Sequence, residues 1–386
     1  PFMGSPKDYM QRLEFQMTQI YYNESRIVDL SVKWQDVIKN RLIKDEDFGL
    51  QLEKTVTAAK PFIEEARQIA DVETRMKFIY NRIRKSMSWN GDEDYVYTDN
   101  GIIKTWETKT GNVADINLLL VNLLNEAGVK TAPILFSTRD HGLVTPTYPS
   151  INQFNTVMAY VVLKDKAYVL DATDKVTNVK LVPEKVVNTN GFIPEGENGR
   201  WKDVLSGKSK YKVMAAIQGE IDEAGIMKGN GLVNCYDYAR AQRVKEWTQD
   251  NMKFKNDYFV TYYPGLKIED IVVNNVDADS LPLEQKVKFS TVLNSSGEYR
   301  YFNINLFSDL EKNPFIAGTR VSDIDFGVHQ EYTIFGNYTI PVGFTFDGIP
   351  ENISMSTPDN GIIFSRTMQA ESNLLNVRMT LEFKRT

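Results

Sequence analysis

KTGNVADINLLLVNLLNEAGV, residues 109–129, is the most apolar part of the chain and the part from which its fold class can be inferred. From Ile116 to Leu124, apolar residues occupy most sides of a helix, so we expect that helix to be buried in the core. Gly128 stands where a left-handed C-terminal cap is expected. A helix that is apolar on most sides must be covered by other elements on most sides.

Strand-forming sequence follows this helix. Residues 131–136 and 156–163 are rich in β-branched and aromatic side chains, and the turn Lys164-Asp165-Lys166 leads into a further strand at residues 167–170. The pattern predicts one central helix packed on an antiparallel sheet.

Upstream of residue 109, the clearest signal is Asp71, which can cap a helix running to about Ser88. Residues 34–59 indicate one or two helices, and Pro61 suits the first turn of another. Residues 8–20, with Leu13, favour a strand, and residues 90–112 are expected to be a loop. The expected buried face of the Asp71 helix contains Val72, Met76, Ile79, Tyr80, Ile83 and Met87.

The pattern changes in the second half of the chain. Prolines and glycines cluster between residues 181 and 200, which predicts a domain boundary there. Beyond it, residues 302–306 and 375–383 alternate between apolar and polar side chains, as in half-buried strands, and residues 238–251 favour a helix. We therefore predict an α+β protein, with helices packed on an antiparallel sheet in residues 26–200 and a mainly-β sandwich in residues 201–386.

Composition excludes several kinds of function. The chain of 386 residues has a net charge of -6, which argues against nucleic acid as a partner. Its one cysteine, Cys235, leaves no internal disulfide and no cysteine-based metal cluster, and we expect no metal or cofactor. Apolar stretches are too short to span a membrane. The start, Pro-Phe-Met, predicts a fragment or processed product.

Three segments carry a resemblance to a known family. Gly111, Val113 and Asp115, followed by the apolar turns and Ala-Gly-Val, resemble the nucleophile helix of the transglutaminase core, whose pattern is Gly-x-Cys-x-Asp. The segment PSINQFNTVMAY (residues 149–160) is similar to the family's Phe-Asn-His-Val strand, with Thr156 at the histidine position. The segment YVLDATD (residues 168–174) is similar to its Tyr-x-Leu-Asp-Ala-Thr strand and retains the aspartate as Asp171.

The resemblance implies a papain-like core over roughly residues 30–180. It also implies that the C-terminal domain is the β domain found beside this core in a group of bacterial exported proteins, on the strength of Arg320 and of residues 313–315 and 325–327. In that group a further β domain precedes the core, and residues 1–25 resemble its tail. The expected location is therefore the periplasm or cell surface of a Gram-negative bacterium.

Thiol catalysis is excluded at the matched positions. Val113 has no lone pair with which to attack a carbonyl, and the hydroxyl of Thr156 cannot act as a base near pH 7. Asp171 is expected to accept amide hydrogens in the turn that follows it. Cys235 lies outside the core and reads as a small buried apolar residue, and we expect His141 and His329 to lie at the surface.

The sequence thus predicts a catalytically inactive transglutaminase-like protein that acts as a binding or scaffolding module. Its retained cleft would take a peptide, protein or glycan, although aromatic residues in such a loop more often cover a core. The alternative is a hydrolase, protease or acyl-transfer enzyme that uses the carboxylates of Asp115, Asp171, Asp140 and Glu107. A subunit of a surface assembly, pairing through edge strands, is a third class. The candidate ligand contacts are Trp106, Asn112, Tyr148, Gln153 and Asn155.

Overall fold

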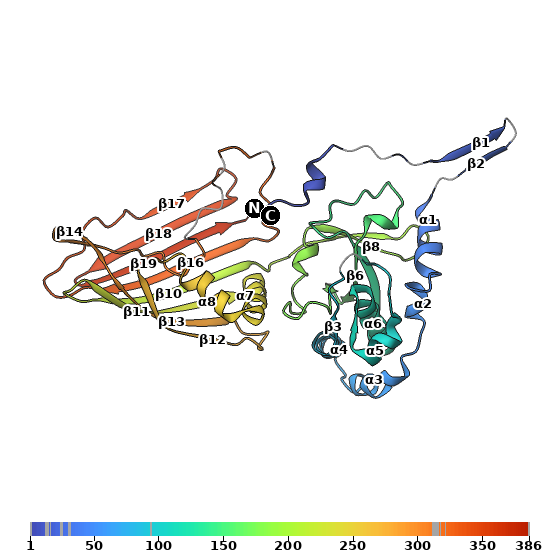
Figure 1. Ribbon diagram of the computed structural model, residues 1–386, viewed down its shortest axis with the longest axis horizontal. Coiled ribbons are helices and arrows are strands. Elements are labelled where there is room, and N and C mark those ends of the chain that lie inside the picture. Colours follow the sequence, from blue (N-terminus) through green and yellow to red (C-terminus); the bar gives the residue numbers. More distant parts are fainter. Residues whose placement is uncertain are drawn as a thin grey trace. The chain divides into compact units, whose positions relative to one another are not determined.

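The computed structural model has an α+β fold (Figure 1). It describes residues 2–11, 15, 17–23, 26–29, 32–92, 95–310, 316, 318–320 and 322–384. Contacts divide the chain into a first unit, Gly4–Ser206, and a second unit, Gly207–Thr386, to which Pro1–Met3 also belong. Strand β9 (Arg200–Val204) is part of the first unit's sheet, so the division falls after the predicted boundary. That residues 1–25 are the tail of a preceding β domain stays a prediction.

The first unit is built on a five-stranded antiparallel sheet with the order β7-β6-β5-β8-β9. The three strands predicted after the central helix are confirmed. Side chains alternate between the two faces of each strand, so Leu135 and Val157 face one side and Phe136 and Met158 the other. The bounds are β5 (Thr131–Phe136), β6 (Thr156–Leu163), β7 (Lys166–Leu170) and β8 (Thr189–Ile193).

Helix α6 (Val113–Glu126) packs on the Leu135 and Val157 face of this sheet, and its residues from 113 to 124 are all buried. Its start is fixed by a capping box, in which the Asn112 side chain accepts from the amide of Asp115 at 2.8 Å and the Asp115 carboxylate accepts from the amide of Asn112 at 3.0 Å. Gly128 has φ of 80°, the left-handed cap that was predicted.

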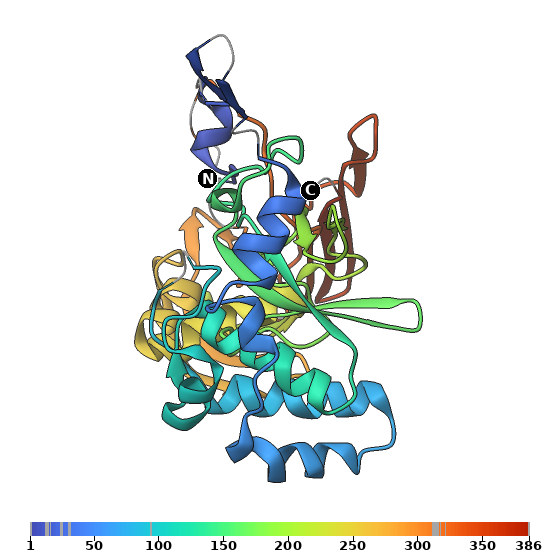
Figure 2. The ribbon, with the colours of Figure 1, turned by 90° about the vertical axis from the view of Figure 1, so that its right-hand side faces the viewer.

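Helix α4 (Val72–Ser86) confirms the predicted helix, and the Asp71 carboxylate caps it by accepting from the amide of Thr74 at 2.8 Å. Val72 is exposed rather than on the buried face. Figure 2 shows α4 beside α3 (Lys60–Arg67), which carries Pro61 in its first turn as predicted. The predicted helices before it are a series of short pieces: α1 (Trp34–Asp36), a π-helical turn η2 (Val37–Ile43), α2 (Gly49–Leu52) and a 3₁₀ turn η3 (Thr57–Ala59).

Two predictions in the first unit are wrong. A strand was expected at residues 8–20, but among the described residues of that range only Gln19 and Ile20 lie in a strand. A 3₁₀ turn η1 (Pro6–Tyr9) comes first, and a hairpin of β1 (Gln19–Asn23) and β2 (Arg26–Asp29) follows. Leu13 lies outside the described residues. The expected loop at residues 90–112 contains helix α5 (Gly101–Thr108), whose turns bury Ile102 and Thr105, and the short strands β3 (Ser88–Trp89) and β4 (Thr110–Gly111) flank it.

The second unit contains one hydrogen-bonded sheet of eight strands, ordered β12-β13-β11-β10-β16-β19-β18-β17, so the predicted two-sheet sandwich is wrong for the described residues. The alternation of apolar and polar side chains indicated strands, but it does not show which strands pair. The bounds are β10 (Tyr211–Ile221), β11 (Ile226–Tyr236), β12 (Leu266–Asn274), β13 (Leu283–Val292), β16 (Gln330–Thr339), β17 (Ile353–Ser356), β18 (Ile362–Glu371) and β19 (Leu374–Phe383), beside a small hairpin of β14 (Asn294–Ser296) and β15 (Tyr299–Tyr301).

Helices α7 (Asp237–Gln249) and α8 (Asn251–Phe259) accompany this sheet, and α7 packs on β10, β11 and β13 (Figure 1). Residues 302–306, predicted as a strand, are irregular, and Phe307 just after them packs against Phe259 and Phe289. The matched residues 313–315 lie outside the described residues. No helix in the described part of the chain is long and apolar enough to cross a membrane.

Candidate functional site

The three positions matched to a catalytic triad are all buried. Val113 begins α6, Thr156 begins β6, and Asp171 follows β7, and each is 1% exposed. Val113 lies one turn before Asn117 on the same face of the helix. The contacts of Asn117 therefore show which segments lie next to the first turn of α6.

Asn117 joins the two strands that carry the other matched positions. Its amide nitrogen donates to the carbonyl of Val157 and to Oδ1 of Asp171, each at 2.9 Å, and its amide oxygen accepts from the backbone of Ala172 at 2.8 Å. The first turns of α6, the start of β6 and the end of β7 thus meet at one place. Asn117 was not singled out in the sequence analysis, although a buried amide in such a helix needs partners.

The carboxylate of Asp171 has hydrogen bonds on Oδ1 and an ion-pair partner at Oδ2. Its Oδ1 also accepts from the amide and hydroxyl of Thr173, at 3.0 and 2.6 Å, which confirms the predicted turn contact. Lys185 Nζ lies 2.8 Å from Oδ2. Burial would raise the pKa of Asp171, but the charge of Lys185 and hydrogen bonds from Lys185, Thr173 and Asn117 outweigh it and hold the pKa below its ordinary value.

Thr156 stands apart from this network. Strand alternation places its side chain with Phe136 and Met158, on the sheet face opposite to α6. Its Oγ1 is buried and has no hydrogen-bond partner among the described residues. A hydroxyl left unpaired in a protein interior is uncommon and destabilising.

Two of the candidate ligand contacts hold the structure together. Besides capping α6, Asn112 donates to the carbonyl of Tyr97 at 3.0 Å. Asn155 accepts from the amide of Thr138 and donates to its hydroxyl, both at 2.9 Å. Both side chains are buried, so a ligand would have to displace these hydrogen bonds to reach them.

The other three candidates are half-buried. Gln153 closes the preceding loop, accepting from the amide of Thr145 at 2.6 Å and donating to the carbonyl of Tyr148 at 2.5 Å. Trp106 stacks on Phe62 with ring centroids 5.8 Å apart, and Lys109 Nζ lies 3.4 Å from the centroid of its indole ring. Their role as ligand contacts stays a prediction.

The other possible nucleophiles have structural surroundings. Cys235 is buried at the end of β11, as predicted, and burial raises the pKa of its thiol to about 11. His141 and His329 are half-buried rather than fully at the surface. Sequence reasoning missed that His141 Nδ1 lies 2.8 Å from Oγ of the buried Ser137. That hydroxyl lies 2.5 Å from the carbonyl of Gly142, which can only accept, so the serine donates there.

The carboxylates of the alternative enzyme hypothesis are in different settings. Asp115 is buried and accepts from the amides of Asn100 and Gly101, at 3.1 and 3.0 Å, as well as from that of Asn112. Asp140 and Glu107 are exposed, and Asp140 accepts from the hydroxyl of Thr138 at 2.6 Å. In the described residues, His, Cys, Asp and Glu side chains form no group of three or more that could hold a metal ion.

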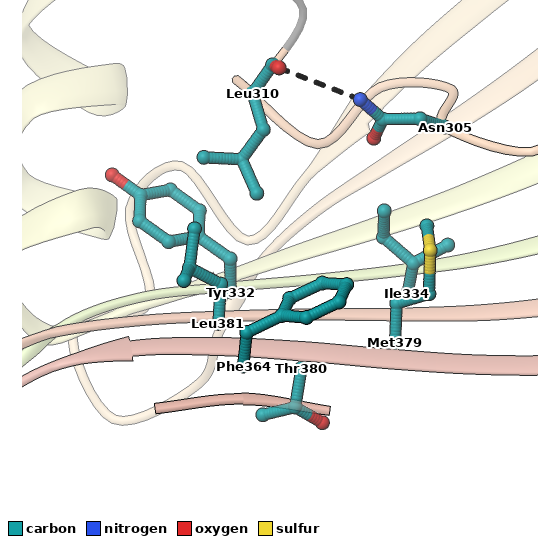
Figure 3. A pocket seen from close by; sticks show the side chains of 8 residues that line it. All are labelled: Asn305, Leu310, Tyr332, Ile334, Phe364, Met379, Thr380 and Leu381. Carbon is teal, nitrogen blue, oxygen red and sulfur yellow. Dashed lines mark hydrogen bonds between the residues drawn. The ribbon is translucent and has the colours of Figure 1, made fainter. Parts of the chain in front are cut away.

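The second unit has a mostly apolar recess of about 230 Å³ on the sheet (Figure 3). The Asn305 amide donates to the carbonyl of Leu310 at 3.4 Å across its rim. Its volume is below that of most small-molecule sites. The recess is lined by Asn305, Leu310, Tyr332, Ile334, Phe364, Met379, Thr380 and Leu381.

Comparisons with known proteins support the fold and leave the activity open. Residues 298–386, which include the lining of that recess, match a family model described as a domain of unknown function with a solved structure, DUF3858. No curated protein matches the chain. A solved structure from Parabacteroides distasonis, described as a "putative protease", is similar over 97% of this chain with a TM-score of 0.50 and 11% identity. The match covers 57% of that protein, so the present chain spans a little over half of its length.

Proposed function

We propose that this chain is a transglutaminase-like module without catalytic activity that binds a peptide, protein or glycan. The observation that carries the proposal is Val113 at the start of α6, where the resemblance expects a cysteine. A helix N-terminus favours a thiolate, but a valine side chain offers it nothing to stabilise.

The surroundings of Val113 support the same proposal. The neighbouring polar side chains have structural roles. Those of Asn112 and Asp115 cap α6. That of Asn117 joins α6 to β6 and to Ala172. Thr156 supplies no base, and the Asp171 carboxylate is engaged by Lys185. By the same resemblance, we propose that the protein is exported, which cell fractionation tests.

Binding is tested on peptide and glycan arrays with the wild-type chain and a Tyr148→Ala variant. Tyr148 is the probe because it is half-buried in the loop after β5. The expected result is a retained ligand whose binding weakens at least about tenfold in the variant, as for a central aromatic contact. Ser290→Ala, on β13 of the second unit, is the matched control and should bind as the wild type does. Absence of any ligand would leave only a scaffolding role.

A second candidate, a hydrolase, is favoured by the 2.8 Å contact between Ser137 and His141 and by the fold shared with a protein described as a "putative protease". Against it, the Ser137 hydroxyl donates to Gly142, so His141 is the donor in its contact with Ser137 and not the base. Peptide hydrolysis that disappears in Ser137→Ala would favour this candidate over the non-catalytic module.

A further inference from the structure

The two oxygens of the Asp171 carboxylate face different groups. Asn117 and Thr173 supply three hydrogen bonds to Oδ1, and Lys185 approaches Oδ2 at 2.8 Å. The Lys185 side chain is 30% exposed, whereas that of Asp171 is 1% exposed. The lysine therefore brings its charge from the surface to a carboxylate that would otherwise be buried without a counter-ion.

The sheet register places Thr156 beside Asp171. Ala159 pairs with Leu170, and Asn117 bridges Val157 to Ala172 further along the same two segments. Continuing that register makes Thr156 and Asp171 diagonal neighbours, and diagonal neighbours lie roughly 7–8 Å apart, within reach of a long side chain. Yet the Thr156 hydroxyl has no partner, so the carboxylate is turned to other donors.

We propose that Lys185 has become the permanent partner of Asp171, so that this carboxylate now braces the sheet and can no longer orient a base at position 156. The inference rests on the proposed loss of catalysis and adds a second reason for it. In a working triad the acidic residue accepts a hydrogen bond from the imidazole N–H and stabilises the imidazolium. A carboxylate that is already paired with an ammonium group stabilises a second cation only weakly.

The experiment places an imidazole near the carboxylate and measures whether the two groups couple. The variants are Thr156→His and the same substitution with Lys185→Met, with Lys185→Arg as the matched control that keeps the charge. The readout is the pKa of the introduced imidazole, followed by NMR. The wild-type chain provides the background signals of His141 and His329.

With Lys185 or its arginine replacement in place, the introduced imidazole should titrate at or below about 6.5, because no free carboxylate faces it. Replacing Lys185 by Met should raise that pKa by at least one unit, because Asp171 is released to stabilise an imidazolium at position 156. An unchanged imidazole pKa in the Lys185→Met variant would overturn the inference.

The Thr156→His variant tests the inference without the removal of Lys185. An imidazole pKa raised by one unit or more above about 6.5 in that variant would overturn the inference even if the Lys185→Met protein failed to fold. Catalysis by the wild-type chain would instead contradict the proposed function, so the two failures can be told apart.

Discussion

The side chain whose removal tests the arrangement of the site most sharply is Asn117. Replacing it with alanine removes its hydrogen bonds to Val157, Ala172 and Asp171. Val157 and Ala172 are fully buried, so water cannot take over their backbone groups. An unsatisfied buried polar group costs about 1–3 kcal/mol, and the better helix propensity of alanine returns at most about 0.7 kcal/mol. We expect Asn117→Ala to lower the free energy of unfolding of the first unit by about 3 kcal/mol.

The assay is urea unfolding followed by tryptophan fluorescence in a Trp247→Phe background, which leaves Trp34, Trp89, Trp106 and Trp201, all in the first unit. Asn125→Ala is the matched control, because Asn125 lies on the same helix but is exposed, and its hydrogen bonds with Thr131 are only partly buried. It should cost about 1 kcal/mol. If the two variants lose the same stability, Asn117 does not join α6 to the sheet in the way described.

Three further predictions concern titration and buried charge. Because the pKa of Asp171 is lowered in the fold, its contribution to stability is present above about pH 4 and is lost as the pH falls through the folded pKa. The stability difference between wild type and Asp171→Asn should therefore shrink on acidification. A difference that stays constant would contradict the assigned ion pair. Because burial raises the pKa of Cys235 to about 11, an aromatic disulfide reagent at pH 8 should label it at least about 100-fold more slowly in native protein than in urea, and rapid native labelling would show the site to be open. Asp309→Asn should destabilise the second unit by about 3 kcal/mol, measured through Trp247, because it leaves the 1%-exposed Arg243 without the carboxylate 2.5 Å from its Nη2; a change below about 0.5 kcal/mol would show the pair to be dispensable.

Local patterns predicted much of the first unit. The capping aspartate of α4, the apolar sides of α6 and the strands after it are set by neighbouring residues, and each was found where expected. Helix α5 was missed because Gly101 opens it after a run of polar loop residues. The eight-stranded sheet of the second unit was missed because alternation marks a strand and does not reveal its neighbours.

The candidate site could be foreseen only in part. The positions of Val113, Thr156 and Asp171 followed from the resemblance, and the turn contact of Asp171 followed from its place at a strand end. The contacts of Asn117 and Lys185 could not be foreseen, since each joins segments far apart in the sequence. The engagement of Asn112 and Asn155 in capping and loop closure was likewise hidden, because an asparagine that stabilises a turn and one that binds a ligand look alike in sequence.

The most direct test of the non-catalytic account is turnover by the wild-type chain. The purified protein would be incubated with a diverse peptide library and a primary amine, and both cleavage and amine incorporation would be followed by mass spectrometry. Heat-denatured protein and Ser137→Ala serve as controls. The account predicts no product above the denatured control. Turnover by the native protein would contradict it, and its loss in Ser137→Ala would identify the serine that replaced the missing thiol.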